Sequence, residues 1–210
     1  MDPTDSPAFP TTVLTIQPIL LAGHGVRLEP LCGSHEAELQ VAAGDGELWH
    51  LPYTSVPRPE ETERYIDVAL KGQAAGHMLP WVVRLESTGE VVGRTRYHDI
   101  VPEVSRVEIG YTWYSSSHHG THVNPACKFL LLTHAFVGLH CEVVGLRTDD
   151  ANVRSQRAIA KLGARRDGLI RHVKRRRDGS TGGTVMYSIL RSEWPQVERR
   201  LRDRLASFVG

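Results

Sequence analysis

The sequence predicts a mixed α/β fold with a mostly antiparallel central sheet and helices on both faces. Hydrophobic periods typical of strands and of helices follow one another in the order β α α β β β α β α β β α. Two turn signals, Ser87-Thr88-Gly89 and Asp178-Gly179, join neighbouring strand-like runs into hairpins, which favours antiparallel pairing. No repeat of about 20 to 50 residues is visible, which argues against a solenoid or a propeller.

Each element follows from a local pattern. Ser34 is expected to cap the first helix, and Ile66 lies on the inner side of the second. Asn152 is expected to begin the fourth helix and Gly163 to end it. The predicted strands are 26–31, 79–85, 90–97, 107–114, 143–148, 170–175 and 184–190, and the predicted helices follow Ser34, span 60–73, follow Asn124, and span 152–162 and 193–206.

Length and composition are typical of a soluble globular protein. The chain has 210 residues, of which 40% are hydrophobic and 23% charged, and its 25 basic and 24 acidic side chains leave a formal charge of +1. This balance suggests no nucleic-acid partner. The three cysteines, Cys32, Cys127 and Cys141, are widely spaced in apolar contexts, which is typical of reduced, buried thiols in a cytoplasmic protein.

Residues 1–20 differ from residues 21–210, which are expected to form a single domain. The first 20 residues contain four prolines and no lysine or arginine, so they lack the positive start of a secretory signal. The apolar patch 13–22 is too short and too interrupted to span a bilayer, and no membrane partner is expected. Two interpretations stay open: residues 13–16 form an edge strand or an oligomer contact, or the whole segment is a disordered extension.

Residues 107–136 read as a strand, a short loop and a helix. Side chains along 107–114 alternate at the period of two that puts neighbours on opposite faces of a strand. After the loop 115–123, Asn124 is expected to cap an apolar helix that Pro125 opens. The unpaired amides and the positive dipole end of such a helix favour a phosphate or pyrophosphate. The sequence therefore predicts an anion site in this loop.

The strand, loop and helix at residues 107–136 are followed by a strand and by a further helix. That helix begins with Asn152-x-x-Ser155 and ends with Lys161-Leu162-Gly163-Ala164. In this order of elements and motifs the chain resembles the GNAT superfamily of acetyl-CoA-dependent N-acetyltransferases, and within it the RimJ/RimL-like branch, over about residues 23–195. The resemblance implies a cleft for acetyl-CoA where strands 107–114 and 143–148 splay apart. It also implies acetyl transfer to a primary amine, either a protein N-terminus or a small amine, and a homodimer.

The resemblance implies where acetyl-CoA binds. The pantetheine arm would pair with the main chain of the strand, as an added strand does, and the pyrophosphate would lie on the loop amides. The usual loop pattern, Gln/Arg-x-x-Gly-x-Gly/Ala, is altered at His119, His122 and Asn124. The predicted cofactor-binding residues are Tyr111, Thr112, Trp113, His119, Gly120, Thr121, His122, Val123, Asn124, Lys128, Asn152 and Ser155, and no metal is expected.

Three side chains are candidates for proton transfer. Ser155 shares a helix face with apolar residues, and the resemblance implies that it protonates the departing thiolate. A base must deprotonate the incoming ammonium, because only the neutral amine attacks. Glu108, expected on the strand face opposite to Tyr111 and Trp113, is the first candidate. Asp167 matches a region where related enzymes carry an acid that acts through water, and is the second candidate.

Each assignment has a structural alternative. Asn152 can be only a helix cap, Ser155 only a small residue that allows close packing, and Glu108 an exposed strand carboxylate. His98 can serve as a base or as a substrate contact, or be a hydrogen-bonded residue at a strand end. Aromatic residues at four places either line an acceptor pocket or belong to the core, namely Trp49, Tyr53, Trp81 and Tyr97.

Two clusters suggest other functions. His118, His119 and His122 could bind zinc in a hydrolase, but the loop has no cysteine or carboxylate to complete a tetrahedral set. The run Lys174-Arg175-Arg176-Arg177 resembles a nucleic-acid patch, but in a near-neutral chain it is expected to be a solvated hairpin tip. The altered loop keeps a non-catalytic CoA-binding or interaction protein as the alternative to an enzyme.

Overall fold

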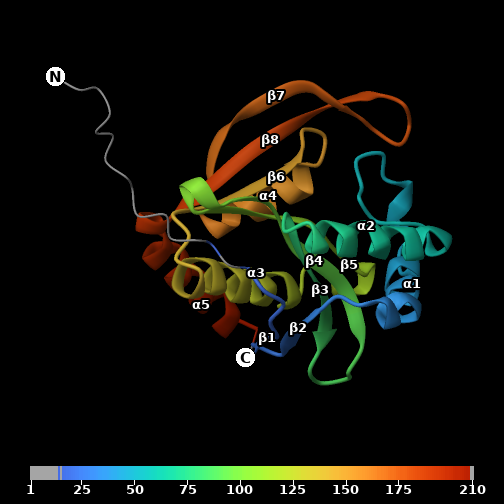
Figure 1. Cartoon of the computed structure of the whole chain (residues 1–210), viewed down its shortest axis with the longest axis horizontal. Coiled ribbons are helices and arrows are strands. Elements are labelled where there is room, and N and C mark those ends of the chain that lie inside the picture. The colour runs from blue at the N-terminus through green and yellow to red at the C-terminus, as the bar shows by residue number, and fades with distance from the viewer. Residues whose placement is uncertain (1–13, 15, 209–210) are drawn as a thin grey trace.

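The computed structural model describes residue 14 and residues 16–208. Its strands form an eight-stranded sheet with the order β1-β2-β3-β4-β5-β6-β8-β7 (Figure 1). The strands are β1 (Leu21–Gly23), β2 (Val26–Pro30), β3 (Met78–Leu85), β4 (Val91–Val101), β5 (Arg106–Tyr114), β6 (Val143–Asp149), β7 (Arg165–Arg175) and β8 (Thr181–Leu190). The α-helices are α1 (Glu36–Gly44), α2 (Thr62–Ala74), α3 (Val123–Thr133), α4 (Val153–Leu162) and α5 (Trp194–Ala206).

The sheet is mostly antiparallel, as predicted, and its one parallel pair opens the cleft. β5 and β6 run parallel and are paired only from Arg106↔Val143 to Ile109↔Leu146. Beyond Ile109, residues 110–114 of β5 continue without a partner on that edge, because β6 diverges from β5 after Leu146 while it stays paired with β8 as far as Asp149. The predicted splay between these two strands is therefore confirmed.

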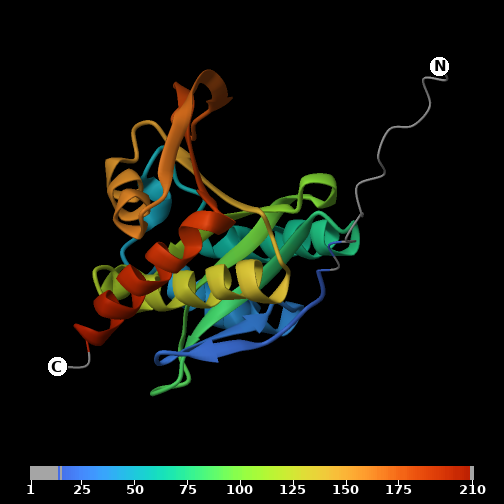
Figure 2. The same ribbon diagram turned by 90° about the vertical axis from the view of Figure 1, so that its left-hand side faces the viewer.

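Helices cover both faces of the sheet, which is also as predicted. On one face, α1 and α2 bury a smaller core around Leu39, Ile66 and Trp113. On the other face, α3 and α5 lie side by side, as Figures 1 and 2 show, over a larger core that includes Trp81 and Tyr97. The β7–β8 hairpin projects from the end of the sheet in both views.

Two predicted helix caps are wrong, and one is confirmed. α1 begins at Glu36 with His35 as its cap, because a 3-10 turn intervenes after Ser34. α3 begins at Val123, whose amide donates to the hydroxyl of Thr121 at 3.3 Å, so Asn124 lies inside the first turn. Asn152 does cap α4: its Oδ1 accepts from the amide of Ser155 at 3.0 Å.

The predicted strand at residues 13–16 lies partly outside the described residues. Leu14 and Ile16, which are described, belong to no strand, although Leu14 is buried and Ile16 packs against the larger core. The edge strand on this side is β1. Among the described residues, no helix is long and apolar enough to cross a membrane.

All three cysteines are free thiols. Cys127 and Cys141 are buried, as predicted, whereas Cys32 is exposed. The prediction of a buried thiol fails at Cys32 because this residue follows the end of β2 and lies in the turn that leads into α1.

Candidate functional site

The space between the splayed strands is a cleft of about 960 Å³. Its floor is residues 109–114 of β5 and the end of β6, and its sides come from the loop before α3 and from the start of α4. The loop 51–56 and the tip of the β7–β8 hairpin, residues 173–177, line its other end. The cleft therefore receives side chains from both halves of the sheet.

A β-bulge at Tyr111 changes the geometry that the alternation predicts. Across the β4–β5 ladder, Arg94 pairs with Trp113 and Arg96 with Gly110, so β5 has one residue more than β4 between these pairs. Tyr111 has φ 50°, in the left-handed region that is costly for a residue with a side chain. The bulge reverses the alternation, so Trp113 does not share the core of Val107 and Ile109.

The bulge corrects one expectation about β5 and places Tyr111 at the cleft. The side chain of Tyr111 is 40% exposed and lines the cleft. Glu108 was expected on the face opposite to Trp113, but the shifted alternation brings the two to the same face of the sheet. Between them, the unpaired edge of residues 110–114 faces the cleft.

The loop before α3 has the features of an anion site. Gly120 has φ 80°, a conformation that glycine adopts without strain. Within the part of the chain that the structure describes, no protein group accepts from the main-chain amides of Gly120, Thr121, His122 or Asn124. These amides lie at the positive end of the α3 dipole and at the side of the cleft. They could bind a phosphate or pyrophosphate.

The side chains of this loop divide into two groups. His119, Thr121 and Asn124 line the cleft, as does Gly120. Val123 is fully buried in the larger core, and the ring of His122 packs 6.4 Å from that of Phe208. Of the predicted loop residues, Val123 and His122 can therefore contact a cleft ligand only through the main chain.

The loop histidines have separate partners. His118 Nδ1 lies 2.8 Å from the hydroxyl of Ser115. His119 lies between the carbonyl of Tyr114, at 3.1 Å from Nε2, and the guanidinium of Arg154, at 2.8 Å from Nδ1. Burial lowers the pKa of His119, and Arg154 lowers it further. The described residues contain no group of three His, Cys, Asp or Glu side chains arranged for a metal ion.

Lys128 points from α3 toward β5. It is buried, lines the cleft, and its Nζ donates to the hydroxyl of Thr112 at 3.2 Å. Thr112 in turn lies 2.7 Å from the hydroxyl of Thr95 on β4. Burial lowers the pKa of Lys128 to about 8. The ammonium therefore lies beside the strand, whereas the sequence predicted it near the phosphates.

The start of α4 brings Asn152 and Ser155 to the cleft. The Oδ1 of Asn152 caps the helix, which is the structural alternative to a role of this oxygen in binding the cofactor. Ser155 is half-buried, and its side chain lines the cleft together with Ala158 and Ile159. A hydroxyl in this position can donate a proton or a hydrogen bond to a group in the cleft.

Glu108 is not an exposed strand carboxylate, because its side chain is 2% exposed. Its Oε1 lies 2.9 Å from Arg147 Nε, as an ion pair without hydrogen-bond alignment, and 3.7 Å from His98 Nε2. Arg106 lies 3.8 Å from Oε2. Burial raises the pKa of Glu108, and Arg147 opposes this rise.

His98 lies opposite Glu108 in the β4–β5 ladder and lines the cleft, whereas Glu108 does not. Its ring packs over Gly110, where a Cβ would come within 2.2 Å of Nε2, and against the edge of Tyr111 at 5.0 Å. Burial lowers the pKa of His98 to about 4, and Arg147 lowers it further. At neutral pH the ring is therefore uncharged, and its two nitrogens face protein groups: Nδ1 lies 3.0 Å from Arg147 Nη2, and Nε2 faces Glu108.

Several candidates do not reach the cleft. Asp167 is exposed on β7, where its Oδ1 accepts from the hydroxyl of Ser188 at 2.9 Å. Trp81 and Tyr97 are fully buried, with ring centroids 5.0 Å apart, so they are core residues. Of the four aromatic candidates, Tyr53 lines the cleft.

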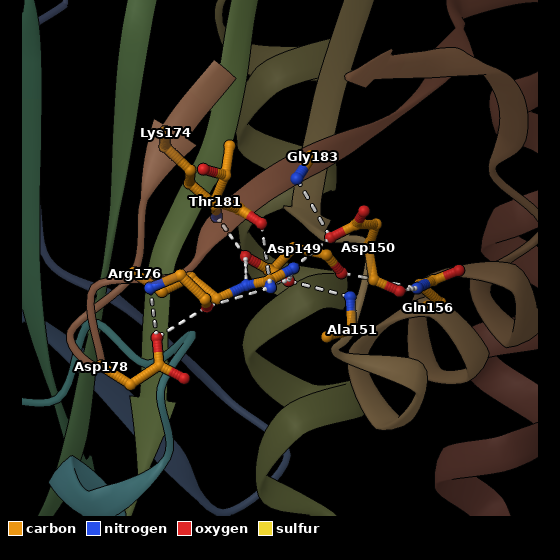
Figure 3. A network of polar contacts seen from close by, with 10 residues as sticks. Asp149, Asp150, Ala151, Gln156, Lys174, Arg176, Asp178, Thr181 and Gly183 are labelled. Atoms are coloured by element: carbon orange, nitrogen blue, oxygen red, sulfur yellow. Dashed lines mark hydrogen bonds and ion pairs between the residues drawn. The ribbon is translucent and has the colours of Figure 1, made fainter. Parts of the chain in front are cut away.

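The basic run of the β7–β8 hairpin is not a freely solvated tip. Arg176 donates through Nε and Nη2 to both oxygens of Asp149, at 2.8 to 3.2 Å, and also contacts Asp150 (Figure 3). Lys174 Nζ lies 3.1 Å from Asp149 Oδ2. Burial alone would raise the pKa of Asp149, but Arg176, the amide of Ala151 and Lys174 together outweigh it and lower the pKa to about 2.

The next residue ties the hairpin to the opposite side of the cleft. Arg177 donates from its guanidinium to the carbonyl of Val56 at 3.0 Å and to Glu61 at 3.1 Å. Its amide donates to the carbonyl of Pro52 at 3.0 Å. Arg176 and Arg177 therefore bridge the β6–α4 connection and the loop before α2. Neither Arg147 nor this bridge could be predicted from local patterns, because their partners are distant in the sequence.

The sequence and the fold are similar to those of known proteins. Residues 26–165 match the acetyltransferase (GNAT) domain family. No curated protein sequence matches at a significant level. Among solved structures, a chain from T. thermophilus assigned as an acetyltransferase is 34% identical, with a TM-score of 0.78 over 91% of this chain and 99% of that chain.

Two further structures are similar. A GCN5-related N-acetyltransferase from Brucella melitensis is 26% identical, with a TM-score of 0.81 over 90% of this chain and 86% of that chain. RimJ from Mycobacterium smegmatis, in complex with CoA-disulfide, is 22% identical, with a TM-score of 0.72 over 92% of this chain and 96% of that chain. At this identity the likeness to RimJ is one of fold.

Proposed function

Because the chain belongs to the GNAT acetyltransferase family, we propose that it transfers the acetyl group of acetyl-CoA directly to a primary amine, on a protein N-terminus or a small molecule. The observation that carries the proposal is the splay of β5 from β6 next to a helix start with free amides. An acyl-CoA needs both features, since its pantetheine arm pairs with an open strand edge and its pyrophosphate needs converging donors.

In the proposed complex, the pyrophosphate lies on the amides of Gly120, Thr121, His122 and Asn124. The pantetheine arm follows the edge of β5 along residues 111–113, and the thioester lies near the point where β5 and β6 separate. Strand amides and Lys128 would stabilise negative charge that develops on the thioester carbonyl, because fixed donors in a dry cleft need no reorganisation. Ser155 and Asn152 face the same ligand from α4.

We propose Glu108 as the general base, acting through a water beside His98. His98 lines the cleft and its Nε2 lies 3.7 Å from Glu108, so a proton from the ammonium can pass to the carboxylate through a water next to the ring. The neutral amine then attacks the thioester carbonyl, the C–N bond forms and the C–S bond breaks. Ser155 protonates the thiolate and recovers a proton from the nitrogen that has attacked, which leaves the neutral amide and free CoA thiol, and no covalent enzyme intermediate forms.

The proposal is tested by measuring thiol release from acetyl-CoA with a panel of primary amines, alongside calorimetry of CoA binding. Glu108→Gln is expected to lower kcat by roughly 10² to 10⁴, the usual contribution of a general base. Asp167→Asn is the matched control: Asp167 lies outside the cleft, so its activity should stay within about twofold of wild type. Equal losses in both variants would contradict the role of Glu108.

The alternative is a CoA-binding or interaction protein without catalysis, which the altered loop favours, because His119 is already engaged by Tyr114 and Arg154. Calorimetry separates the two functions. CoA binding without thiol release with any amine supports the alternative, whereas absence of CoA binding contradicts both.

A further inference from the structure

Two arginines on β4 are buried without a counter-ion. Arg94 is 0% exposed and Arg96 is 1% exposed. None of the three guanidinium nitrogens of Arg94 has a hydrogen-bond partner, and neither does Nε of Arg96. Arg96 Nη1 contacts Met78 Sδ at 2.8 Å, and a thioether is a weak acceptor. Among residues 14 and 16–208, no carboxylate lies within ion-pair distance of either side chain.

Aromatic rings are the main neighbours of these charges. The Arg94 guanidinium lies 4.1 Å from the ring centroid of Tyr65, and that of Arg96 lies 3.7 Å from the ring centroid of Tyr111. Burial lowers the pKa of Arg94 to about 10, although the Tyr65 ring opposes this shift, so the group is still charged at neutral pH. Stacking on rings does not satisfy the N–H donors, which point along the plane of the guanidinium.

Buried polar groups in native proteins almost always have partners, and buried charges are paired or bind an ion. Two adjacent like charges with unused donors therefore indicate a missing anion. The arrangement matches a carboxylate in particular, because a guanidinium offers two parallel N–H groups at the spacing of the two carboxylate oxygens.

Neither arginine lines the cleft, but Arg96 lies directly behind Tyr111, a residue that does. Tyr111 contacts the guanidinium of Arg96 on one side and lines the cleft on the other. His98, which contacts the edge of Tyr111, is two residues further along β4 than Arg96, a separation of about 7 Å along a strand. A small molecule that bears an amine and a carboxylate a few bonds apart spans such a distance once hydrogen bonds are added at each end.

We propose that the acceptor is a primary amine that carries a carboxylate, and that Arg96, supported by Arg94, binds this carboxylate while the amine lies at His98. This inference rests on the proposed function. The ring of Tyr111 moves aside to admit the carboxylate, and its left-handed backbone at the bulge is a position where stored strain eases such a change. The anion then takes the place of the ring as partner of the guanidinium.

The first experiment compares matched amines in the thiol-release assay with acetyl-CoA. The pairs are glycine and glycinamide, β-alanine and β-alaninamide, and L-glutamate and its diamide, each compared at equal concentration of the neutral amine. A parallel arm uses dipeptide amides with an N-terminal aspartate or asparagine, which distinguishes an acidic peptide from a free amino acid. We expect kcat/KM at least tenfold higher for the carboxylate-bearing member in one arm. Equal or higher values for neutral amines in both arms overturn the inference and leave the proposed function intact.

The second experiment asks whether Arg96 is responsible. Arg96→Met should abolish the preference through a rise in KM for carboxylate-bearing amines, with activity toward the neutral member retained. Arg84→Met is the matched control, because Arg84 on β3 is paired with Glu29 at 2.9 Å and Glu38 at 2.6 Å. The control should leave the amine preference unchanged. If Arg96→Met lowers turnover of both members equally, the arginine is structural and the inference fails.

A binding measurement keeps the test independent of turnover. N-acetylglycine, the product analogue with a carboxylate, should raise the melting temperature of the wild-type protein, whereas N-acetylglycinamide should not. Arg96→Met should lose this response and should itself be no less stable than wild type, because it removes an unpaired buried charge. If no amine is acetylated, the proposed function fails, and the rise in melting temperature with N-acetylglycine alone decides whether the anion site exists. An equal response to both ligands contradicts it.

Discussion

The ion pairs of Asp149 connect the β7–β8 hairpin to the cleft and allow a quantitative prediction. The Asp149 side chain is 1% exposed, and it accepts from Arg176 and from the amide of Ala151, with Lys174 Nζ at 3.1 Å. Asp149→Asn keeps the shape of the side chain but removes its charge. It also turns an N–H donor toward the donors of Arg176 or Lys174, so hydrogen bonds are lost along with the ion pairs.

The magnitude follows from burial. A hydrogen bond to a charged group contributes about 1.5–3 kcal/mol, and breaking a fully buried pair costs about 3–5 kcal/mol. The side chains of Arg176 and Lys174 keep 14% and 39% of their exposure, so water can solvate them in the variant. We therefore expect the lower end, a loss of about 2–3 kcal/mol in the free energy of unfolding. For a chain of this size, this corresponds to a fall of roughly 5–10 °C in Tm.

The assay is thermal unfolding followed by circular dichroism at pH 7. Asp178→Asn is the control: the same chemical change in the same hairpin, at an exposed aspartate whose partners are the amide and hydroxyl of Ser180. Its Tm should stay within about 2 °C of wild type. If Asp149→Asn melts as the control does, the network does not stabilise the hairpin and the reasoning is refuted.

The same pair of proteins gives a pH dependence. The pKa of Asp149 in the folded protein is about 2, below its value of about 3.9 in an unfolded chain. A depressed pKa stabilises the fold fully above the unfolded value, and this stability is lost as pH falls through the folded value. The difference in Tm between wild type and Asp149→Asn should therefore shrink between about pH 4 and pH 2. A difference that is constant with pH would show that charge is not its cause.

Three further variants test the cleft. Ser155→Ala should lower kcat by roughly 10- to 100-fold without weakening CoA binding in calorimetry, and a weaker CoA affinity at unchanged kcat would contradict its role as an acid. Gly110→Ala pushes a Cβ to within 2.2 Å of His98 Nε2 and should lower kcat/KM by about 10- to 100-fold; near-normal activity would mean that the position of His98 is unimportant. Lys128→Met should raise Tm at pH 7, because it removes a buried charge. Wild type should gain stability between about pH 8 and 10, where only the unfolded chain holds the Lys128 proton, and the variant should lack this gain. A Tm of the variant below that of wild type would contradict this reasoning.

Local patterns were sufficient for the strand, loop and helix that border the cleft and for most other elements, because hydrophobic periods depend on nearest neighbours along the chain. The short strand β1 was not predicted, and β7 begins at Arg165, five residues before the predicted start. The cap of α4 by Asn152 is local for the same reason, because its hydrogen bond spans three residues. The predicted cap of α1 failed because the 3-10 turn Gly33–His35 precedes the helix, and that of α3 failed because the hydroxyl of Thr121 accepts from the amide of Val123.

The roles of individual side chains depended on contacts that the sequence does not contain. The bulge at Tyr111 arises from pairing with β4, and it reversed the faces that alternation assigns to Glu108 and Trp113. Burial excluded the alternative of an exposed strand carboxylate for Glu108, which lies between Arg147 and His98. Asp167, which the resemblance suggested as the second candidate for the base, lies outside the cleft on the exposed hairpin.

By itself, the sequence determined the class of fold and the strand, loop and helix at residues 107–136, because these follow from periodicity and backbone chemistry that act over a few residues. The splay of β5 from β6 was implied by the resemblance to the GNAT family. Only the tertiary structure decided which charges are paired. Arg176 found two carboxylates from another connection, whereas Arg94 and Arg96 found none among the described residues. Partners of a charge come from strands and loops that lie far apart in the chain, and their distances are set when the sheet assembles.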